Sequence, residues 1–359
     1  MLIALKELFP DAPVYTSIYA PDQMPAVMRT WDIRCSDLDR LPRIHDHHQA
    51  ALPLYPFVWE QFDFSDYDVV LSNKSGFCHG IITPPETLHL CYCLTPTRYL
   101  WNTQSYMQRE DVGRWRRRAL APVLTALRVW DASAAQRVDR FAAISRAVQQ
   151  RIETYYRAES TLIYPPVDTS RFAPGERGDY FLIVSRLIPY KRIDMAVEAF
   201  NRLGLPLVIA GDGRDRAALE AAAGPNIRFL GRIPDEAVSE WMGGARAFIF
   251  PGEEDFGITP LEAASAGTPV VAYAGGGALD TVIDGETGLF FEEPTAASLA
   301  EAVRRFETMP FDLGRLQQHA RQFDTARFKA RVMEWVESSV AEHQRSLYRP
   351  HPFNLKEEW

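Results

Sequence analysis

The chain has 359 residues, of which 47% are hydrophobic and 12% aromatic, and its formal net charge is −8. This length accommodates two domains with packed cores, while the acidic balance argues against a general nucleic-acid binder, which is normally basic. No apolar run approaches the roughly 18 residues of a membrane span. Lys6 and Glu7 interrupt the short apolar start, so no secretory signal is predicted and we expect a cytoplasmic protein.

Short buried strands alternate with helical segments along the chain. In the amino half, strands are predicted at residues 68–71, 88–93, 141–144 and 162–164. In the carboxyl half, they are predicted at residues 181–184, 207–210, 227–230, 247–250, 270–273 and 289–291. This alternation is typical of parallel sheets covered on both faces, so we expect an α/β protein with two Rossmann-like domains. Pro165-Pro166 and Pro174-Gly175 mark the junction, which divides the chain into domains 1–172 and 173–339.

A basic segment precedes an apolar stripe within residues 109–130. The stripe runs at helical spacing from Leu120 to Trp130. Such a helix suits an anionic membrane surface, and a core-packed helix with a solvated charged face is the alternative. The candidate membrane-surface residues are Arg114, Arg116, Arg117 and Arg118.

Two basic residues follow the buried strand at 181–184. Ligands of an open α/β sheet bind beyond the carboxyl ends of its strands, so Arg186 and Lys191 are expected in that crevice. Arginine offers a planar fork to phosphate oxygens, and lysine offers a mobile point charge. Either residue alone is more simply a solvated surface charge, but a second motif favours a binding role for both.

That second motif is Glu254-Asp255-Phe256-Gly257-Ile258-Thr259-Pro260-Leu261-Glu262. It joins an apolar strand to a helix start, where the free amides around Gly257 and Ile258 and the helix dipole favour an anion. Glu254 and Glu262 flank this anion site, and carboxylates suit hydroxyl groups rather than phosphate. The segment therefore indicates a nucleotide-sugar site, with Glu262 on the ribose diol, Glu254 on the sugar, and Phe256 among the donor-binding residues.

Arg186, Lys191 and the Glu254-x7-Glu262 motif, followed by Ala266-Gly267-Thr268-Pro269-Val270-Val271, resemble the donor half of a family 4 retaining glycosyltransferase with the GT-B fold. The resemblance is closest to bacterial mannosyltransferase-like members that build O-antigen and capsule polysaccharides. It covers nearly the whole chain from Leu8 onward.

The resemblance implies a hexosyltransferase that retains anomeric configuration and needs neither a metal nor a cofactor. The implied donor is a nucleotide sugar, with GDP-mannose favoured, and the implied acceptor is a lipid-linked saccharide at the inner membrane surface. Glu254, Arg186 and Lys191 are then the catalytic residues, because the two cations and the helix amides stabilise the departing diphosphate.

Three further residues join the predicted donor side. Arg232 lies in a loop expected to border the base, and Gly213 follows a strand of the donor domain. Gly276 would let the backbone approach the donor sugar closely, with a plain flexible turn as the alternative.

On the acceptor side, Thr95 and Arg98 follow the strand at 88–93, and a structural ion pair is the alternative role of Arg98. Related proteins often carry a histidine where this chain has Leu94. They also begin with a strand and a Gly-Gly turn, whereas Met1 already lies in the following helix. We therefore expect a first domain without its first strand, and a natural start roughly 20–25 residues earlier. The resemblance also implies that residues 340–359 pack back on the first domain.

Three other motifs resemble metal-binding or dinucleotide-binding sites but do not fit the requirements of those sites. Asp66-Tyr67-Asp68 precedes a strand instead of following one, and His45-Asp46-His47-His48 lacks ligands to complete a shell, so no metal site is predicted. Gly211-Asp212-Gly213 has Arg216 in place of the third glycine of a dinucleotide fingerprint. Two other functions stay open: a nucleotide-sugar-binding protein with weak or no turnover, and a GT-B epimerase or phosphorylase.

Overall fold

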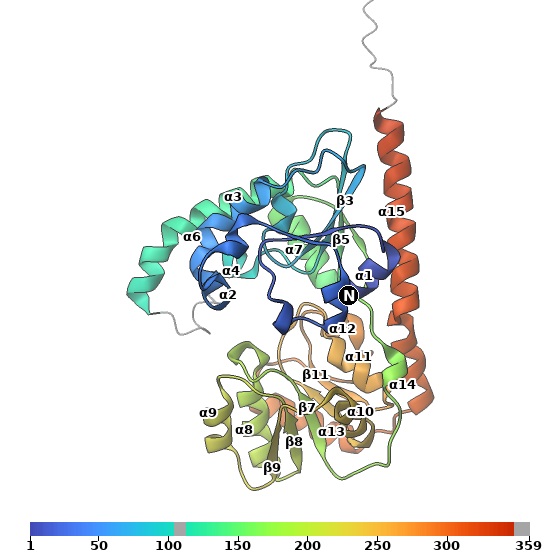
Figure 1. Cartoon of the computed structure of the whole chain (residues 1–359). Helices are drawn as coiled ribbons and strands as arrows, with labels where there is room; N and C mark the ends of the chain where they lie inside the picture. Colours follow the sequence, from blue (N-terminus) through green and yellow to red (C-terminus); the bar gives the residue numbers. More distant parts are fainter. Residues whose placement is uncertain (104–112, 348–359) are drawn as a thin grey trace, which may run out of the picture.

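The computed structural model describes residues 1–103 and 113–347, which fold into two α/β domains, one above the other in Figure 1. The chain builds the first domain, crosses to the second after strand β6 (Ser160–Leu162), and returns in the last helix, α15 (Thr325–Leu347). Within the described residues, no helix is both long and apolar enough to cross a membrane.

The main sheet of the first domain has four parallel strands in the order β3-β4-β5-β6. All six residues of β4 are buried, because this strand has neighbours on both edges and helices on both faces. Its register places Leu88 opposite Val69 of β3. The remaining strands of this sheet are β3 (Val69–Lys74), β4 (Leu88–Cys93) and β5 (Arg140–Ala143).

Helices cover both faces of this sheet. The Ser145 hydroxyl accepts a hydrogen bond of 3.1 Å from the Val148 amide, which fixes the start of α7 by satisfying a free amide of its first turn. The α-helices of the first domain are α1 (Leu2–Leu8), α2 (Ile44–His47), α3 (Tyr55–Glu60), α4 (Arg98–Trp101), α6 (Arg114–Ala135) and α7 (Arg146–Tyr156). Its 3₁₀ helices are η1 (Pro21–Gln23), η2 (Ala26–Thr30), η3 (Asp37–Arg40), η4 (His48–Leu54) and η5 (Cys78–Gly80).

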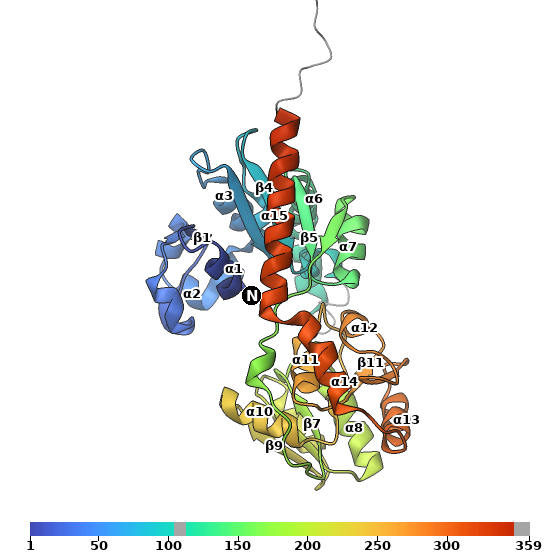
Figure 2. The ribbon, with the colours of Figure 1, turned by 90° about the vertical axis from the view of Figure 1, so that its right-hand side faces the viewer.

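A small lobe stands beside the main sheet of the first domain (Figure 2). Its two strands, β1 (Val14–Thr16) and β2 (Ile33–Cys35), pair in parallel in a sheet of their own. Aromatic contacts join the lobe to the segment that leads into β3. The Tyr15 and Phe64 ring centroids are 4.9 Å apart, and the Tyr15 and Tyr67 hydroxyls share a hydrogen bond of 3.0 Å.

The second domain contains a six-stranded parallel sheet in the order β12-β11-β10-β7-β8-β9. The order reverses between β7 and β10, which is where an open α/β sheet offers a ligand crevice. The strands are β7 (Phe181–Val184), β8 (Leu207–Ala210), β9 (Ile227–Gly231), β10 (Phe248–Phe250), β11 (Val270–Tyr273) and β12 (Gly288–Phe291).

The sheet of the second domain is buried on both faces. Phe200 of α8 and Val303 of α13 belong to the apolar cluster on one face, and Ala263 of α11 belongs to the cluster on the other. The α-helices are α8 (Ile193–Leu203), α9 (Arg216–Ala222), α10 (Asp235–Gly244), α11 (Ile258–Ser265), α12 (Ala278–Thr281), α13 (Ala296–Glu307) and α14 (Leu313–Ala320). The 3₁₀ helices along this half are η6 (Thr169–Arg171), η7 (Pro189–Lys191) and η8 (Arg321–Phe323).

Helix α15 runs from the second domain along the length of the first (Figure 2). Phe328, Val332 and Trp335 are buried in the core of the first domain, where the Phe328 ring centroid lies 5.7 Å from that of Tyr92. Packing on the first domain therefore begins at Phe328, and Val340, within the segment 340–359, also lies against this core. Residues 348–359 of that segment lie outside the described residues.

Candidate active site

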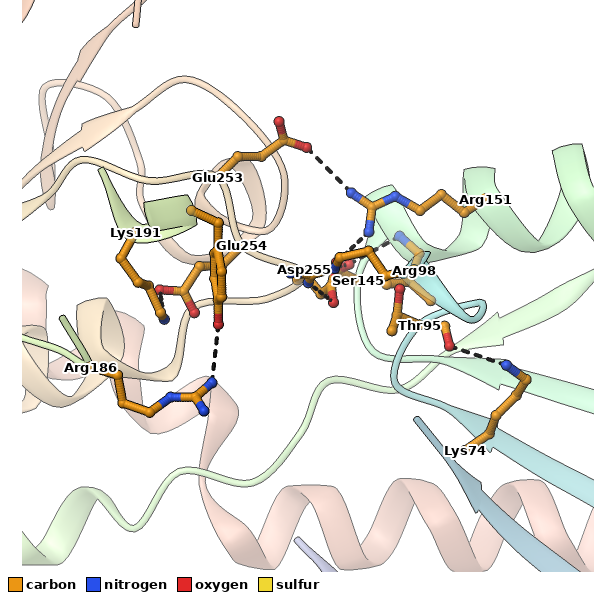
Figure 3. Close-up of polar contacts among 12 residues, drawn as sticks. Lys74, Thr95, Arg98, Ser145, Arg151, Arg186, Lys191, Glu253, Glu254 and Asp255 are labelled. Atoms are coloured by element: carbon orange, nitrogen blue, oxygen red, sulfur yellow. Dashed lines mark hydrogen bonds and ion pairs between the residues drawn. The ribbon is translucent and has the colours of Figure 1, made fainter. Parts of the chain in front are cut away.

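Two of the predicted catalytic residues lie against each other. Lys191 ends η7, in the loop after β7, and Glu254 lies in the loop after β10. Because β7 and β10 are neighbours in the sheet, these loops meet at its carboxyl edge. There, Lys191 Nζ and a carboxylate oxygen of Glu254 form an ion pair, with side chains 14% and 22% exposed (Figure 3).

Arg186, the third predicted catalytic residue, lies near this pair in Figure 3. Its side chain is exposed, and its Nη2 donates a hydrogen bond of 3.1 Å to the Tyr190 hydroxyl. The exposed guanidinium of Arg186 and the largely buried ammonium of Lys191 give this edge of the sheet two positive groups. Such an arrangement suits a diphosphate, which can accept from both.

The start of α11 supplies the backbone part of the site. Gly257 caps the helix with φ of 89°, a left-handed conformation that favours glycine, and Ile258 is the first helical residue. The first amides of a helix have no partner within it, so they are available to an anion. Phe256 has another role: it is buried against the rings of Tyr164 and Phe323, at centroid distances of 5.7 and 5.9 Å, and anchors the loop.

Gly276 packs against the backbone of Glu254. Its φ is 58°, and a Cβ at this position would lie 2.2 Å from the Glu254 carbonyl oxygen. The amide of Gly277 donates a hydrogen bond of 2.8 Å to the same oxygen. The glycine turn therefore fixes the backbone of Glu254, a role that the sequence analysis did not assign to it.

Glu262 lies about one turn inside α11 and is partly buried. Burial raises the pKa of Glu262 from 4.5 to about 7, while the Arg171 guanidinium acts to lower it and the Asp235 carboxylate to raise it. Arg171 and Asp235 themselves form an ion pair of 3.2 Å. The charge of the Glu262 carboxyl therefore changes near neutral pH.

The other two predicted donor residues lie on neighbouring loops. Gly213 follows β8, and a Cβ there would lie 2.2 Å from the Leu187 carbonyl oxygen, so the close approach is to the chain itself. Arg232 follows β9 and is exposed. Asp235, whose carboxylate raises the pKa of Glu262, is the first residue of α10, directly after this loop.

The predicted acceptor residues come from the first domain. Arg98 forms an ion pair with Asp255 of the second domain, which is the role named as its alternative. The Thr95 carbonyl accepts a hydrogen bond of 3.3 Å from Lys74 Nζ, and the buried Thr95 hydroxyl has no hydrogen-bond partner in the described chain (Figure 3).

A buried polar network supports the segment from Thr95 to Arg98. Asp131 accepts hydrogen bonds from the hydroxyl of Thr97 at 2.7 Å, from the indole of Trp101 at 2.7 Å and from the hydroxyl of Tyr156 at 2.8 Å. Lys74 is fully buried and donates to the Thr97 hydroxyl at 3.3 Å. A network with so many partners holds its segment in one conformation.

Asp255 joins the two domains, and the sequence analysis gave it no role. It forms ion pairs with Arg98 and Arg151, and its carbonyl accepts a hydrogen bond of 2.5 Å from the Ser145 hydroxyl (Figure 3). Asp255 belongs to the motif that runs from Glu254 to Glu262, but its hydrogen-bond partners lie more than a hundred residues away in the sequence. No local pattern could have paired them.

Asp280 forms a second link between the domains. Its carboxylate accepts hydrogen bonds of 2.8 Å from Arg146 Nη1 and 2.9 Å from the Tyr164 hydroxyl, and the Arg146 amide adds another of 2.9 Å. Asp255 precedes α11 in the chain and Asp280 lies in α12 after it, so the two links hold this part of the second domain against the first.

The predicted membrane-surface arginines begin α6. The side chains of Arg114, Arg116 and Arg117 lie outside the described residues, and that of Arg118 is exposed. No group of three or more potential metal ligands of the His, Cys, Asp and Glu types occurs in residues 1–103 and 113–347.

A comparison with protein families matches residues 168–323 to the model described as glycosyl transferases group 1. The matched segment contains Arg186, Lys191, Glu254 and Glu262, so the candidate site lies within it.

Characterised relatives match about half of the chain. One is the D-inositol 3-phosphate glycosyltransferase of Geodermatophilus obscurus, 32% identical over 46% of this chain and 45% of its own length. Another is the GDP-mannose-dependent alpha-(1-6)-phosphatidylinositol monomannoside mannosyltransferase of Mycolicibacterium smegmatis, 32% identical over 45% of this chain and 50% of its own. The chain thus matches about half the length of these relatives.

Solved structures match nearly all of the chain. HepE from Anabaena in complex with UDP-glucose has a TM-score of 0.65 at 17% identity and covers 94% of both chains. Sucrose-phosphate synthase from Thermosynechococcus elongatus has a TM-score of 0.63 at 19% identity, over 86% of this chain and 84% of its own. At these identities the likeness concerns the fold, and it confirms the predicted GT-B architecture with two parallel-sheet domains.

Proposed function

We propose that the chain is a family 4 retaining glycosyltransferase that moves mannose from GDP-mannose to a lipid-linked saccharide in cell-surface polysaccharide synthesis. The observation that carries this proposal is the ion pair of Lys191 and Glu254 at the start of α11. A cation, free helix amides and a carboxylate in one place match the two parts of a nucleotide sugar, the charged diphosphate and the hydroxylated ring.

In this proposal, the donor diphosphate lies at the amides of Gly257 and Ile258, between Arg186 and Lys191. The Lys191 ammonium has three donor hydrogens, so it can keep Glu254 and also reach a phosphate oxygen. Glu254 retains a second carboxylate oxygen for a sugar hydroxyl. Glu262 accepts from the ribose hydroxyls when it is ionised.

The reaction breaks the bond between the anomeric carbon and the diphosphate oxygen and forms a bond from that carbon to the acceptor oxygen. The acceptor hydroxyl proton passes to the departing diphosphate on the same face of the sugar. Stabilising the charge that develops on this diphosphate is the main catalytic task, and it falls to Arg186, Lys191 and the helix amides. The proposal requires no metal ion and no cofactor.

The proposed substrates take support from the relatives. One matched relative is named as GDP-mannose-dependent and acts on a phosphatidylinositol monomannoside, and another is a GDP-mannose-dependent alpha-mannosyltransferase, 32% identical over 139 residues. The basic run Arg116-Arg117-Arg118 would bring the enzyme to the inner membrane surface, where the proposed lipid-linked acceptor lies.

A donor panel tests the proposal. Purified protein is incubated with radiolabelled GDP-mannose, UDP-glucose or UDP-N-acetylglucosamine, with and without bacterial membrane lipid extract, in the presence and absence of EDTA. Product from GDP-mannose that requires lipid and resists EDTA supports the proposal. Donor binding without product supports the non-catalytic alternative, and conversion of the donor without lipid supports an epimerase. Loss of activity with EDTA contradicts the metal-free mechanism.

A further inference from the structure

Tyr190 lies among the charged groups of the proposed active site. It is the second residue of η7, between Arg186 and Lys191 in the chain, and it is partly buried. Its loop packs directly on the loop that carries Glu254, because a Cβ on Gly252 would lie 2.8 Å from the carbonyl oxygens of both Tyr190 and Lys191. This contact fixes the backbone of Tyr190 beside the site, where Arg186, Lys191 and Glu254 lie close together (Figure 3).

The hydroxyl of Tyr190 has a hydrogen left to donate. Arg186 Nη2 donates a hydrogen bond of 3.1 Å to this hydroxyl. A guanidinium has five donor hydrogens and no acceptor, so the oxygen of Tyr190 must accept in this contact. Among residues 1–103 and 113–347, no group accepts a hydrogen bond from the Tyr190 hydroxyl. The hydroxyl and the guanidinium therefore offer their remaining hydrogens side by side.

Positive charge gathers around the Tyr190 ring. Lys191 Nζ and Arg98 Cζ each lie 5.3 Å from its centroid, and Arg98 comes from the first domain. The negative face of an aromatic ring attracts such cations. Lys191 and Arg98 each have a carboxylate partner, whereas Arg186 has none in the part of the chain that the structure describes. A cation without a carboxylate, next to a hydroxyl that can still donate, suits an anionic ligand.

We propose that the Tyr190 hydroxyl is a catalytic group that donates a hydrogen bond to the donor phosphate carrying the sugar. The inference rests on the proposed function, because it adds a third side chain to Arg186 and Lys191 at the departing diphosphate. Negative charge on this phosphate grows as its bond to the anomeric carbon breaks, so the hydrogen bond strengthens toward the transition state. Tyr190 keeps its proton throughout, since the acceptor proton passes to the diphosphate.

Nucleotide binding to Tyr190→Phe tests the inference without turnover, because this variant keeps the ring and loses only the hydroxyl. In titration calorimetry, the affinity for GDP should fall about 10- to 100-fold, the range for a hydrogen bond to a charged group. The affinity for GMP, which lacks the phosphate in question, should stay unchanged. UDP and UMP give the same comparison if the protein prefers uridine nucleotides.

Two further variants make the test specific. Tyr67→Phe is the matched control, because the Tyr67 hydroxyl also accepts a hydrogen bond from an arginine, Arg34, at 2.9 Å, but in the first domain. Its nucleotide affinities should equal those of the wild type, and denaturant unfolding should show that both tyrosine variants are folded. The Arg186→Met background separates direct contact from support of Arg186. There, Tyr190→Phe should again lower the GDP affinity by a similar factor.

The opposite outcomes are equally definite. A wild type that prefers the diphosphate, with a Tyr190→Phe variant that prefers it equally, overturns the inference and leaves the proposed function intact. An effect of Tyr190→Phe that disappears in the Arg186→Met background shows that Tyr190 only positions Arg186. A raised acceptor KM with unchanged GDP affinity assigns the hydroxyl to the acceptor instead. A wild type that binds GDP and UDP no more tightly than GMP and UMP overturns both proposals.

Discussion

Arg151 of the first domain and Asp255 of the second form an ion pair across the boundary between the two domains. Their side chains are 26% and 15% exposed, so the pair is partly shielded from water. Asp255 directly follows Glu254 in the chain, and Arg151 also contacts Glu253 at 3.3 Å. The position of Glu254, the residue proposed to bind the sugar, therefore depends on the position of the first domain.

We expect Asp255→Asn to loosen this arrangement. The substitution leaves Arg98 and Arg151 without their carboxylate and should lower the free energy of unfolding by about 1–3 kcal/mol. It should also reduce kcat/KM for sugar transfer, because the ion pairs of Asp255 no longer hold the adjacent Glu254 in position. Denaturant unfolding measures the first effect, and initial-rate kinetics of sugar transfer measure the second. Asp37→Asn is the control, since that side chain is 93% exposed, and equal results for both variants would contradict the role of Asp255.

A comparison of alanine substitutions at two glycines with positive φ can distinguish the cost of backbone strain from the cost of a steric clash. Gly276 and Gly285 have φ of 58° and 76°, but a Cβ on Gly276 would meet the Glu254 carbonyl oxygen at 2.2 Å, whereas one on Gly285 would meet nothing within 4 Å. Gly285→Ala should cost about 1 kcal/mol in unfolding free energy. Gly276→Ala should cost more and should also weaken donor binding, measured by titration calorimetry. Equal donor affinities in the two folded variants would show that Gly276 does not position Glu254.

Lys191→Met tests charge stabilisation of the departing diphosphate. The substitution removes a cation and leaves Glu254 without its ion-pair partner, so kcat/KM should fall about 10²- to 10³-fold. Arg202→Met is the control, because its pair with Glu198 lies on the exposed surface of α8, with side chains 53% and 57% exposed. A Lys191→Met enzyme that is folded and as active as the control would remove this residue from the mechanism.

The raised pKa of Glu262 predicts a pH dependence of stability. Its pKa is about 7 in the folded protein against 4.5 as the ordinary value, so the folded state holds the proton more tightly. The resulting stabilisation is complete below pH 4.5 and is lost as the pH rises to about 7. Glu262→Gln should therefore raise the unfolding free energy at pH 8, by up to about 3 kcal/mol, and change it little at pH 4.5. Thermal melts across this range provide the measurement, and a variant effect independent of pH would refute the assignment.

The strands of the second domain could be predicted from the sequence because their signals are local. The apolar runs at 181–184 and 207–210 coincide with β7 and β8, and the turn before α11 contains the expected glycine. The meeting of Lys191 with Glu254 also followed from a general rule, that the carboxyl ends of adjacent parallel strands share one edge. Local patterns and this rule were therefore sufficient to predict the strands of the second domain and to place Lys191 and Glu254 at one edge of its sheet.

The first domain shows what sequence patterns cannot supply. The partners of Asp255 lie on α4 and α7 of the other domain, and only tertiary structure brings them together. Lys74 is a charged residue, yet it is fully buried, because a network of hydroxyl and carbonyl acceptors surrounds it.

The packing of α15 on the first domain determines when that domain can complete its core during synthesis. Phe328, Val332 and Trp335 complete the hydrophobic interior of a domain whose other parts are encoded before residue 172. During synthesis from the amino end, that interior stays open until the whole second domain has emerged from the ribosome. The first half of the chain therefore remains partly unburied and prone to aggregation until α15 has been synthesised.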